Sequence, residues 1–265
     1  MIRMATKDDE QILYDFWLKE LDYNTFNIGD LAAFGTENHD LQTIWMQLDQ
    51  GRIMATVLLY KDNIVLYFPK ENTEFVDYDG FAACLAGRNG KNISAMDYVW
   101  QGFKPFMQTD TMKEIPTYLC VLDVEQAKTQ NADSVQLADG KVVGDIFAMQ
   151  LEIFGTQRKE QDYQQFQDDI AAENVYCAVI YQDEKLVSQA TITAISPYSA
   201  MVVGVATDVE YRQKGYARAT LSKLVAVAKQ RKLQSLVLFY DNPNAGALYH
   251  DVGFNTIGQW IMVEL

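Results

Sequence analysis

The stretch EYRQKGYARATL, Glu210–Leu221, decides how the second half of this chain folds. An apolar, β-branched run before it predicts a strand over 200–207, and the helical spacing after it predicts a helix over 214–231. Another apolar run predicts a buried strand over 233–240. Strand, helix and strand in this order predict a parallel, right-handed crossover whose first turn contains Gly215.

This glycine turn has the character of an anion site. Arg212, Lys214 and Arg218 surround Gly215 in a chain whose formal net charge is -14. A helix N-terminus presents unpaired backbone N–H groups and the positive end of the helix dipole, and Gly215 and Ala217 place little bulk before them. A pyrophosphate fits this description, and the alternative is an ordinary tight turn with solvated cations. The spacing matches neither the Walker loop nor the dinucleotide fingerprint.

Two sequence blocks resemble a known family. Arg212-Gln-Lys-Gly215-Tyr-Ala217 resembles the acyl-CoA-binding signature of the GNAT superfamily of N-acyltransferases, Arg/Gln-x-x-Gly-x-Gly/Ala. The block DNPNAGALYHDVGF, Asp241–Phe254, is similar to the family's Asn-containing helix that ends in Leu-Tyr-x-x-x-Gly-Phe. The resemblance covers about residues 133–265, and it extends more loosely to a two-domain bacterial subgroup with an N-terminal half of similar architecture.

The resemblance implies acetyl-CoA as co-substrate and assigns roles to particular residues. Tyr249 matches the family tyrosine that protonates the departing thiolate, and a phenol (pKa about 10) suits an aliphatic thiol (about 8.5) for this transfer. The alternative for Tyr249 is a core aromatic. A main-chain N–H of the strand before the turn would hold the oxyanion. The residues that would bind CoA lie on that strand, in the turn and at the start of the later helix: Val205, Thr207, Arg212, Gln213, Lys214, Gly215, Tyr216, Ala217, Arg218, Asn242 and Asn244.

The sequence shows no obvious general base. Asp208 is expected to shape the turn, and Glu210 is expected on the surface, so a water relay is an open alternative. His250 adjoins Tyr249, but adjacent helical residues point in different directions, and we expect it on the surface. Cys177 lies in an apolar strand and is expected in the core, which argues against a cysteine nucleophile.

The whole chain is expected to be α+β, with two tandem domains of mixed β-sheet and flanking helices. We predict a degenerate GNAT-like domain over 1–124, a linker over 125–133 and the catalytic domain over 134–265. In the first half, Pro69-Lys70-Glu71 stands where the glycine turn should be, so this half is expected to lack a CoA site. After Phe254 the chain has room for one strand bent at Gly258, and the strand 116–123 is expected to fill the open sheet position, so that the halves share strands.

Composition limits the partners and the compartment. A pI near 4.5 argues against nucleic acid and anionic membranes, which bind basic faces. No apolar run approaches the roughly 20 residues of a membrane span. Three separated cysteines fit a reducing cytoplasm, and two histidines do not build a histidine-rich metal site. We expect a cytoplasmic monomer or homodimer without metal.

Three functions remain open at this level. The first is an N-acetyltransferase that transfers the acetyl group of acetyl-CoA to a small-molecule amine. The second is a catalytically weak acyl-CoA-binding regulatory protein of the same fold, because a fold does not guarantee turnover. The third is an interaction module whose glycine turn is only structural.

Overall fold

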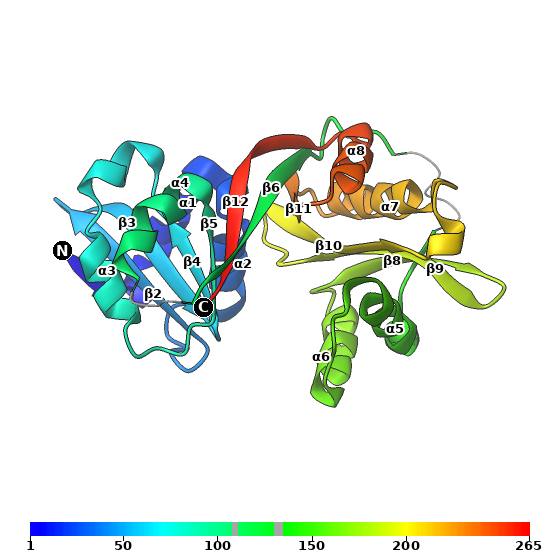
Figure 1. Ribbon diagram of the computed structural model, residues 1–265, viewed down its shortest axis with the longest axis horizontal. Coiled ribbons are helices and arrows are strands. Elements are labelled where there is room, and N and C mark those ends of the chain that lie inside the picture. Colours follow the sequence, from blue (N-terminus) through cyan, green and yellow to red (C-terminus); the bar gives the residue numbers. More distant parts are fainter. Residues whose placement is uncertain (108–110, 130–134) are drawn as a thin grey trace. The chain divides into compact units, whose positions relative to one another are not determined.

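The computed structural model describes residues 1–107, 111–129 and 135–265 (Figure 1), and it divides into two compact units. The first unit comprises Met1–Leu119, Phe239–Asp241 and Ile257–Leu265; the second comprises Cys120–Leu238 and Asn242–Thr256. The predicted domains, 1–124 and 134–265, stay a prediction, because compact units are not tests of independent folding. Residues 130–133 of the predicted linker lie outside the described residues.

The first unit is a mixed sheet with helices. Its strand order is β1-β2-β3-β4-β5-β12-β6; β4 and β5 run parallel, whereas β1 to β4 are successively antiparallel and β12 is antiparallel to β5. The strands are β1 (Ile2–Met4), β2 (Gln42–Asp49), β3 (Arg52–Tyr60), β4 (Asn63–Tyr67), β5 (Asn92–Met96), β6 (Lys113–Asp123) and β12 (Asn255–Glu264). The helices are α1 (Glu10–Trp17), α2 (Thr25–Phe34), α3 (Tyr78–Leu85) and α4 (Asp97–Phe103), with 3-10 turns at Lys7–Asp9, Leu18–Tyr23, Lys70–Phe75 and Lys104–Phe106.

The second unit repeats this plan. Its strand order is β6-β11-β10-β9-β8-β7, with β10 and β11 parallel and β7 to β10 antiparallel. The strands are β7 (Gln136–Leu137), β8 (Tyr176–Gln182), β9 (Lys185–Thr193), β10 (Ser199–Thr207) and β11 (Ser235–Tyr240). The helices are α5 (Val143–Phe154), α6 (Glu160–Ala171), α7 (Tyr216–Gln230) and α8 (Pro243–Val252), with 3-10 turns at Gly140–Val142 and Val209–Tyr211. In Figure 1, α5 and α6 lie on one face of β8–β10, and α7 and α8 lie on the other.

The predicted α+β class and the crossover around Gly215 are confirmed. β10 and β11 run parallel and α7 connects them. A hairpin joins β8 to β9, and its two central residues, Asp183 and Glu184, have positive φ angles of 47° and 64°. This is the backbone of the tight hairpin turns that match the twist of paired strands.

The chain ends in one strand, β12, as predicted, and β6 lies beside β11 in the second unit. Cys120–Asp123 of β6 belong to the second unit, whereas its earlier residues belong to the first. The prediction that strand 116–123 also serves the second half is therefore confirmed. The bend expected at Gly258 stays a prediction; a Cβ there would stand 2.5 Å from Met96 Cε on β5, the end of a flexible side chain that would have to shift.

The helix α2 is a feature that sequence reasoning missed. Polar Thr25 and Asn27 are buried along with Ile28 and Leu31, so its sequence carries no clean apolar stripe. Among the described residues, no helix combines the length and the apolar character that crossing a bilayer requires.

Candidate functional site

The site begins where β10 and β11 part. Their parallel register covers only Ser199–Met201 against Ser235–Val237. On its other edge, β10 pairs with β9, and the register shifts between Val203 and Ala206. The later part of β10, which carries the predicted pantetheine partners Val205 and Thr207, therefore has an edge that β11 does not pair with. An extended ligand with amide groups can add to such an edge.

Asp208 builds the turn that follows β10. Its Oδ1 accepts a hydrogen bond from the Glu210 backbone N–H at 2.9 Å, and its Oδ2 lies 2.5 Å from Lys185 Nζ. The Lys185 hydrogen bond, with the Glu210 N–H, holds the pKa of the Asp208 carboxyl below its usual value. Asp208 therefore stays ionised and structural, which confirms the turn role predicted for it and argues against a general base.

The helix α7 begins on a left-handed glycine. Gly215 is the N-cap with φ 83°, and no side chain caps the helix. The first backbone bond joins Ala219 N–H to Gly215 O at 3.0 Å, so the amides of Tyr216–Arg218 precede the helical bonding. Apart from its chain neighbours, no described residue has an atom within 4 Å of a Cβ built on Gly215, so the space at the helix start is open. Gln213 is also left-handed, with φ 60°. This arrangement fits an anion.

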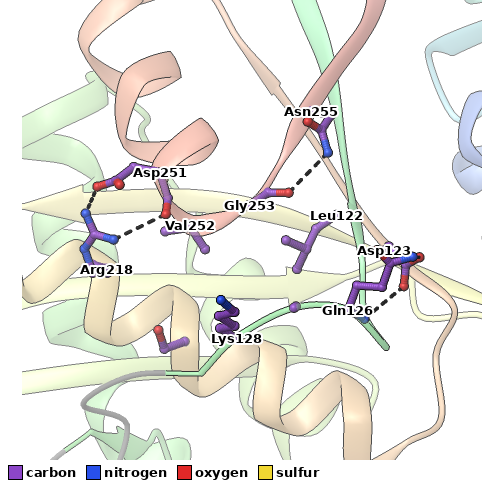
Figure 2. Close-up of a pocket in the computed structure, with 11 residues that line it drawn as sticks. Leu122, Asp123, Gln126, Lys128, Arg218, Asp251, Val252, Gly253 and Asn255 are labelled. Carbon is purple, nitrogen blue, oxygen red and sulfur yellow. Dashed lines mark hydrogen bonds and ion pairs between the residues drawn. The ribbon is translucent and has the colours of Figure 1, made fainter.

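The predicted cations brace the turn. Arg212 Nε donates to Thr207 O at 3.1 Å, and Lys214 Nζ donates to Glu210 O at 3.0 Å. Arg218, on the first turn of α7, forms an ion pair with Asp251 and also donates to the Asp251 backbone oxygen (Figure 2). These contacts keep positive charge near the helix start and fix the backbone that would meet the anion.

The helix α8 carries the remaining predicted residues. Asn242 is its N-cap, and its side-chain oxygen accepts from Asn244 N–H at 2.9 Å. Among the described residues the Asn242 NH2 group has no hydrogen-bond acceptor, so it can donate to a ligand. The Tyr249 side chain is buried, with its ring edge-to-face against Phe254 at 6.1 Å between centroids. This packing fits a core aromatic as well as a positioned acid, so the role of Tyr249 stays a prediction.

A cavity of about 340 Å³ lies beside Arg218 in the second unit (Figure 2). Both signs of charge line it, since Asp123 and Asp251 accompany Arg218 and Lys128. Its other lining residues are Leu122, Gln126, Ala127, Ser222, Val252, Gly253 and Asn255. Sequence reasoning assigned 122–128 to the first half and the linker, although buried Leu122 and Val124 signal that this segment packs against a core.

The remaining reactive side chains are placed as expected. Cys177 is buried, and burial raises the pKa of its thiol to about 12, so it is not a thiolate nucleophile. His250 is exposed, and its Nε2 lies 2.9 Å from Thr256 Oγ1. In the described part of the chain, no group of three or more His, Cys, Asp or Glu side chains is arranged to hold a metal ion.

The matching helix start in the first unit has a different cap. β4 leads through Lys70–Phe75 to α3, whose N-cap is Asp77. The Asp77 carboxylate accepts from Gly80 N–H at 2.9 Å, and it lies 2.5 Å from where a Gly80 Cβ would stand. A carboxylate of the protein therefore occupies the position at which α7 presents open amides.

Comparison with known structures identifies the fold. A Drosophila melanogaster protein solved by structural genomics has a TM-score of 0.68 at 10% identity, with 100% of this chain and 98% of that chain covered. A tandem GNAT protein from the clavulanic acid biosynthesis pathway has a TM-score of 0.60 at 13% identity, with 100% and 98% covered. A GCN5-related N-acetyltransferase from Sphaerobacter thermophilus has a TM-score of 0.62 at 12% identity, with 100% and 95% covered. The chain thus has the tandem GNAT fold over its full length.

The family assignment rests on the second half. Residues 143–254 match the model of the Acetyltransferase (GNAT) family, and the C-terminal half of the chain belongs to this family. The resemblance found in the Arg212–Ala217 and Asp241–Phe254 motifs is confirmed by this match. No curated protein matches the chain.

Proposed function

We propose that this protein is an acetyl-CoA-dependent N-acetyltransferase for a small-molecule amine. The observation that carries the proposal is the open, left-handed start of α7 at Gly215, which directly follows the strand β10 and its unpaired edge. Pyrophosphate would accept from the amides of residues 213–218, and the pantetheine arm would pair with the main chain of Val205 and Thr207. The family of the C-terminal half uses acyl-CoA, which supports this assignment.

The reaction needs a neutral amine, a stabilised oxyanion and a proton for the thiolate. The amine nitrogen attacks the thioester carbon, the N–C bond forms, and the C–S bond then breaks. A main-chain N–H of β10 near Val205 would hold the developing oxyanion. Tyr249 would donate its phenolic proton to the CoA sulfur, and the proton lost by the amine would leave through water, since Asp208 is committed to Lys185.

A two-stage experiment tests this function. The melting temperature of the full chain is first measured with acetyl-CoA and with the nucleotide AMP as a control ligand. Free thiol released from acetyl-CoA is then followed with DTNB across a panel of primary amines. Stabilisation by acetyl-CoA with amine-dependent thiol release supports the enzyme; stabilisation without release favours an acyl-CoA-binding regulator, and no stabilisation favours an interaction module.

A further inference from the structure

Two side-chain amides lie close to a glycine of β10, Gly204. Gly204 lies at the register shift and is left-handed, with φ 61°. A Cβ built on Gly204 would stand 3.3 Å from Gln150 Nε2 and 3.9 Å from Gln189 Nε2. Gln150 comes from α5 and Gln189 from β9. Two N–H donors from different elements therefore face the backbone just before Val205, where the thioester would lie.

The carbonyl oxygen of each side-chain amide has a donor of its own, a guanidinium for Gln150 and the weaker thiol for Gln189. Gln150 Oε1 accepts from Arg158 Nη2 at 3.2 Å, and Gln189 Oε1 accepts from Cys177 Sγ at 4.0 Å. Each oxygen is thus assigned by a donor, which leaves each nitrogen directed toward Gly204. Gln189 is fully buried, and its Nε2 has no acceptor among the described residues. A buried donor without a partner is uncommon in folded proteins and indicates a missing acceptor.

These donors approach from the face opposite α7. Gln189 is directly paired with Ala206 and Val179, which belong to the core cluster that packs against α5. Directly paired residues share a face of the sheet. Figure 1 shows α5 on this face and α7 on the other. The helix α7 would hold the CoA phosphates on its own side of the sheet. The acceptor amine would therefore reach the thioester from the side of α5.

Arg158 adds a positive charge to the same group. It is exposed in the connection between α5 and α6, with its guanidinium 5.3 Å from the Phe147 ring centroid. Within the described part of the chain it forms no ion pair; its contacts are Gln150 and Phe147. A guanidinium with two neighbouring amide donors is a set that suits a carboxylate.

We propose that Gln150, Gln189 and Arg158 form the acceptor subsite and bind a carboxylate close to the reacting nitrogen, so that the substrate is an amino acid or a similar amino carboxylate. This inference rests on the proposed acetyltransferase function. The side-chain amides of Gln150 and Gln189 donate to the substrate carboxylate over Gly204. Arg158, which is hydrogen-bonded to Gln150, balances the negative charge of that carboxylate. The subsite thereby positions the amine against the acyl carbon.

The test uses matched pairs of acceptors: amino acids and the amines that remain when their carboxylate is removed. The full chain should acetylate the amino acid of a pair with the higher kcat/KM. Gln189→Leu keeps the side-chain size and removes the donor, and Arg158→Gln removes the charge. Each should lower kcat/KM for amino acids about 10- to 100-fold, because a hydrogen bond to a charged group is lost, and should leave the decarboxylated amines nearly unchanged.

Gln164→Leu is the control, since it makes the same substitution at an exposed position of α6, where Gln164 Nε2 donates to Asp168 Oδ1 at 2.9 Å and lies outside the 4 Å neighbourhood of the Gly204 Cβ position. It should change neither activity. The affinity for acetyl-CoA, measured by calorimetry, should be the same in all variants. Gln189→Leu should melt no lower than the wild type, because an unpaired buried donor is replaced by an apolar group.

The outcomes separate the two proposals. Transfer without a preference for amino acids, or a preference that Gln189→Leu and Arg158→Gln leave intact, overturns the carboxylate subsite while the acetyltransferase stands. In that case the Gln189 amide would donate its hydrogen bond to a buried water or to the acyl group, and not to a substrate carboxylate. Absence of transfer to every amine overturns the acetyltransferase and the subsite together.

Discussion

A negative charge introduced at position 215 gives the sharpest test of the CoA site. In Gly215→Glu a carboxylate would stand before the open amides of α7, where the pyrophosphate is expected. Two unit charges about 5 Å apart repel by about 3 kcal/mol near a protein surface, which is a factor of more than about 100 in affinity. At a ligand concentration of about 100 Kd, acetyl-CoA should stabilise the wild type by about 2.7 kcal/mol, or roughly 5–10 °C in melting temperature. For Gly215→Glu the shift should fall to about 1 °C.

Gly215→Ala is the matched control. Both substitutions force an L side chain into the left-handed region at φ 83°, which costs about 1–2 kcal/mol, and neither Cβ meets a protein atom within 4 Å. Without ligand, Gly215→Glu should melt no lower than Gly215→Ala, because a negative charge at a helix N-terminus is favourable. With acetyl-CoA, Gly215→Ala should retain more of the shift. A folded Gly215→Glu protein that acetyl-CoA stabilises as much as the wild type would refute the site.

Further outcomes follow from other parts of the chain. Tyr249→Phe should keep the affinity for acetyl-CoA and lower kcat by roughly 10- to 1000-fold in the thiol-release assay, and an unchanged kcat would remove Tyr249 from the mechanism. Calorimetry of the full chain should give one acetyl-CoA per chain; two would contradict a first half without a site. The Arg3 hydrogen bond lowers the pKa of Asp9 to about 2. The ionised Asp9 carboxylate therefore contributes about 2 kcal/mol to the free energy of unfolding above pH ~4, and this contribution is lost toward pH ~2. Asp9→Asn should flatten the curve of stability against pH in this range. A chain shortened to 135–265 should be far less stable than 119–265, because it lacks the buried residues of 120–124, and equal melting temperatures would disprove this.

The sequence predicts well those structural features that depend on residues close together in the chain. Alternating and apolar runs predict β2, β3 and β4, and the turn residues between them predict the hairpins, because both signals act between near neighbours. The glycine turn is equally local: a left-handed backbone at Gly215 needs no side chain from elsewhere to form. Its consequence, an open helix start, is therefore visible before the fold is known.

The acceptor subsite could not be predicted in the same way. Gln150 and Gln189 are 39 residues apart, and only the packing of α5 against the sheet brings them to one point. A glutamine in an amphipathic helix or strand is an ordinary surface residue in a sequence, so neither carries a signal alone. The one local hint was Gly204 within a β-branched strand, which is typical of a bulge or a close approach. Its meaning depends on which side chains the tertiary structure directs toward it.

The two units share a strand arrangement but differ in the cap of the helix that follows it. In each unit a parallel strand pair has three paired positions, Asn63–Val65 with Asn92–Ser94 in the first and Ser199–Met201 with Ser235–Val237 in the second. The strands therefore part in both units, and that geometry alone does not select one for CoA. The difference lies at the helix that follows. Asp77 caps α3 with its own carboxylate, whereas Gly215 leaves α7 uncapped and open. Because a carboxylate and a phosphate compete for the same N–H groups, we expect the Asp77 cap to exclude CoA from the first half and the uncapped Gly215 start to admit it in the second.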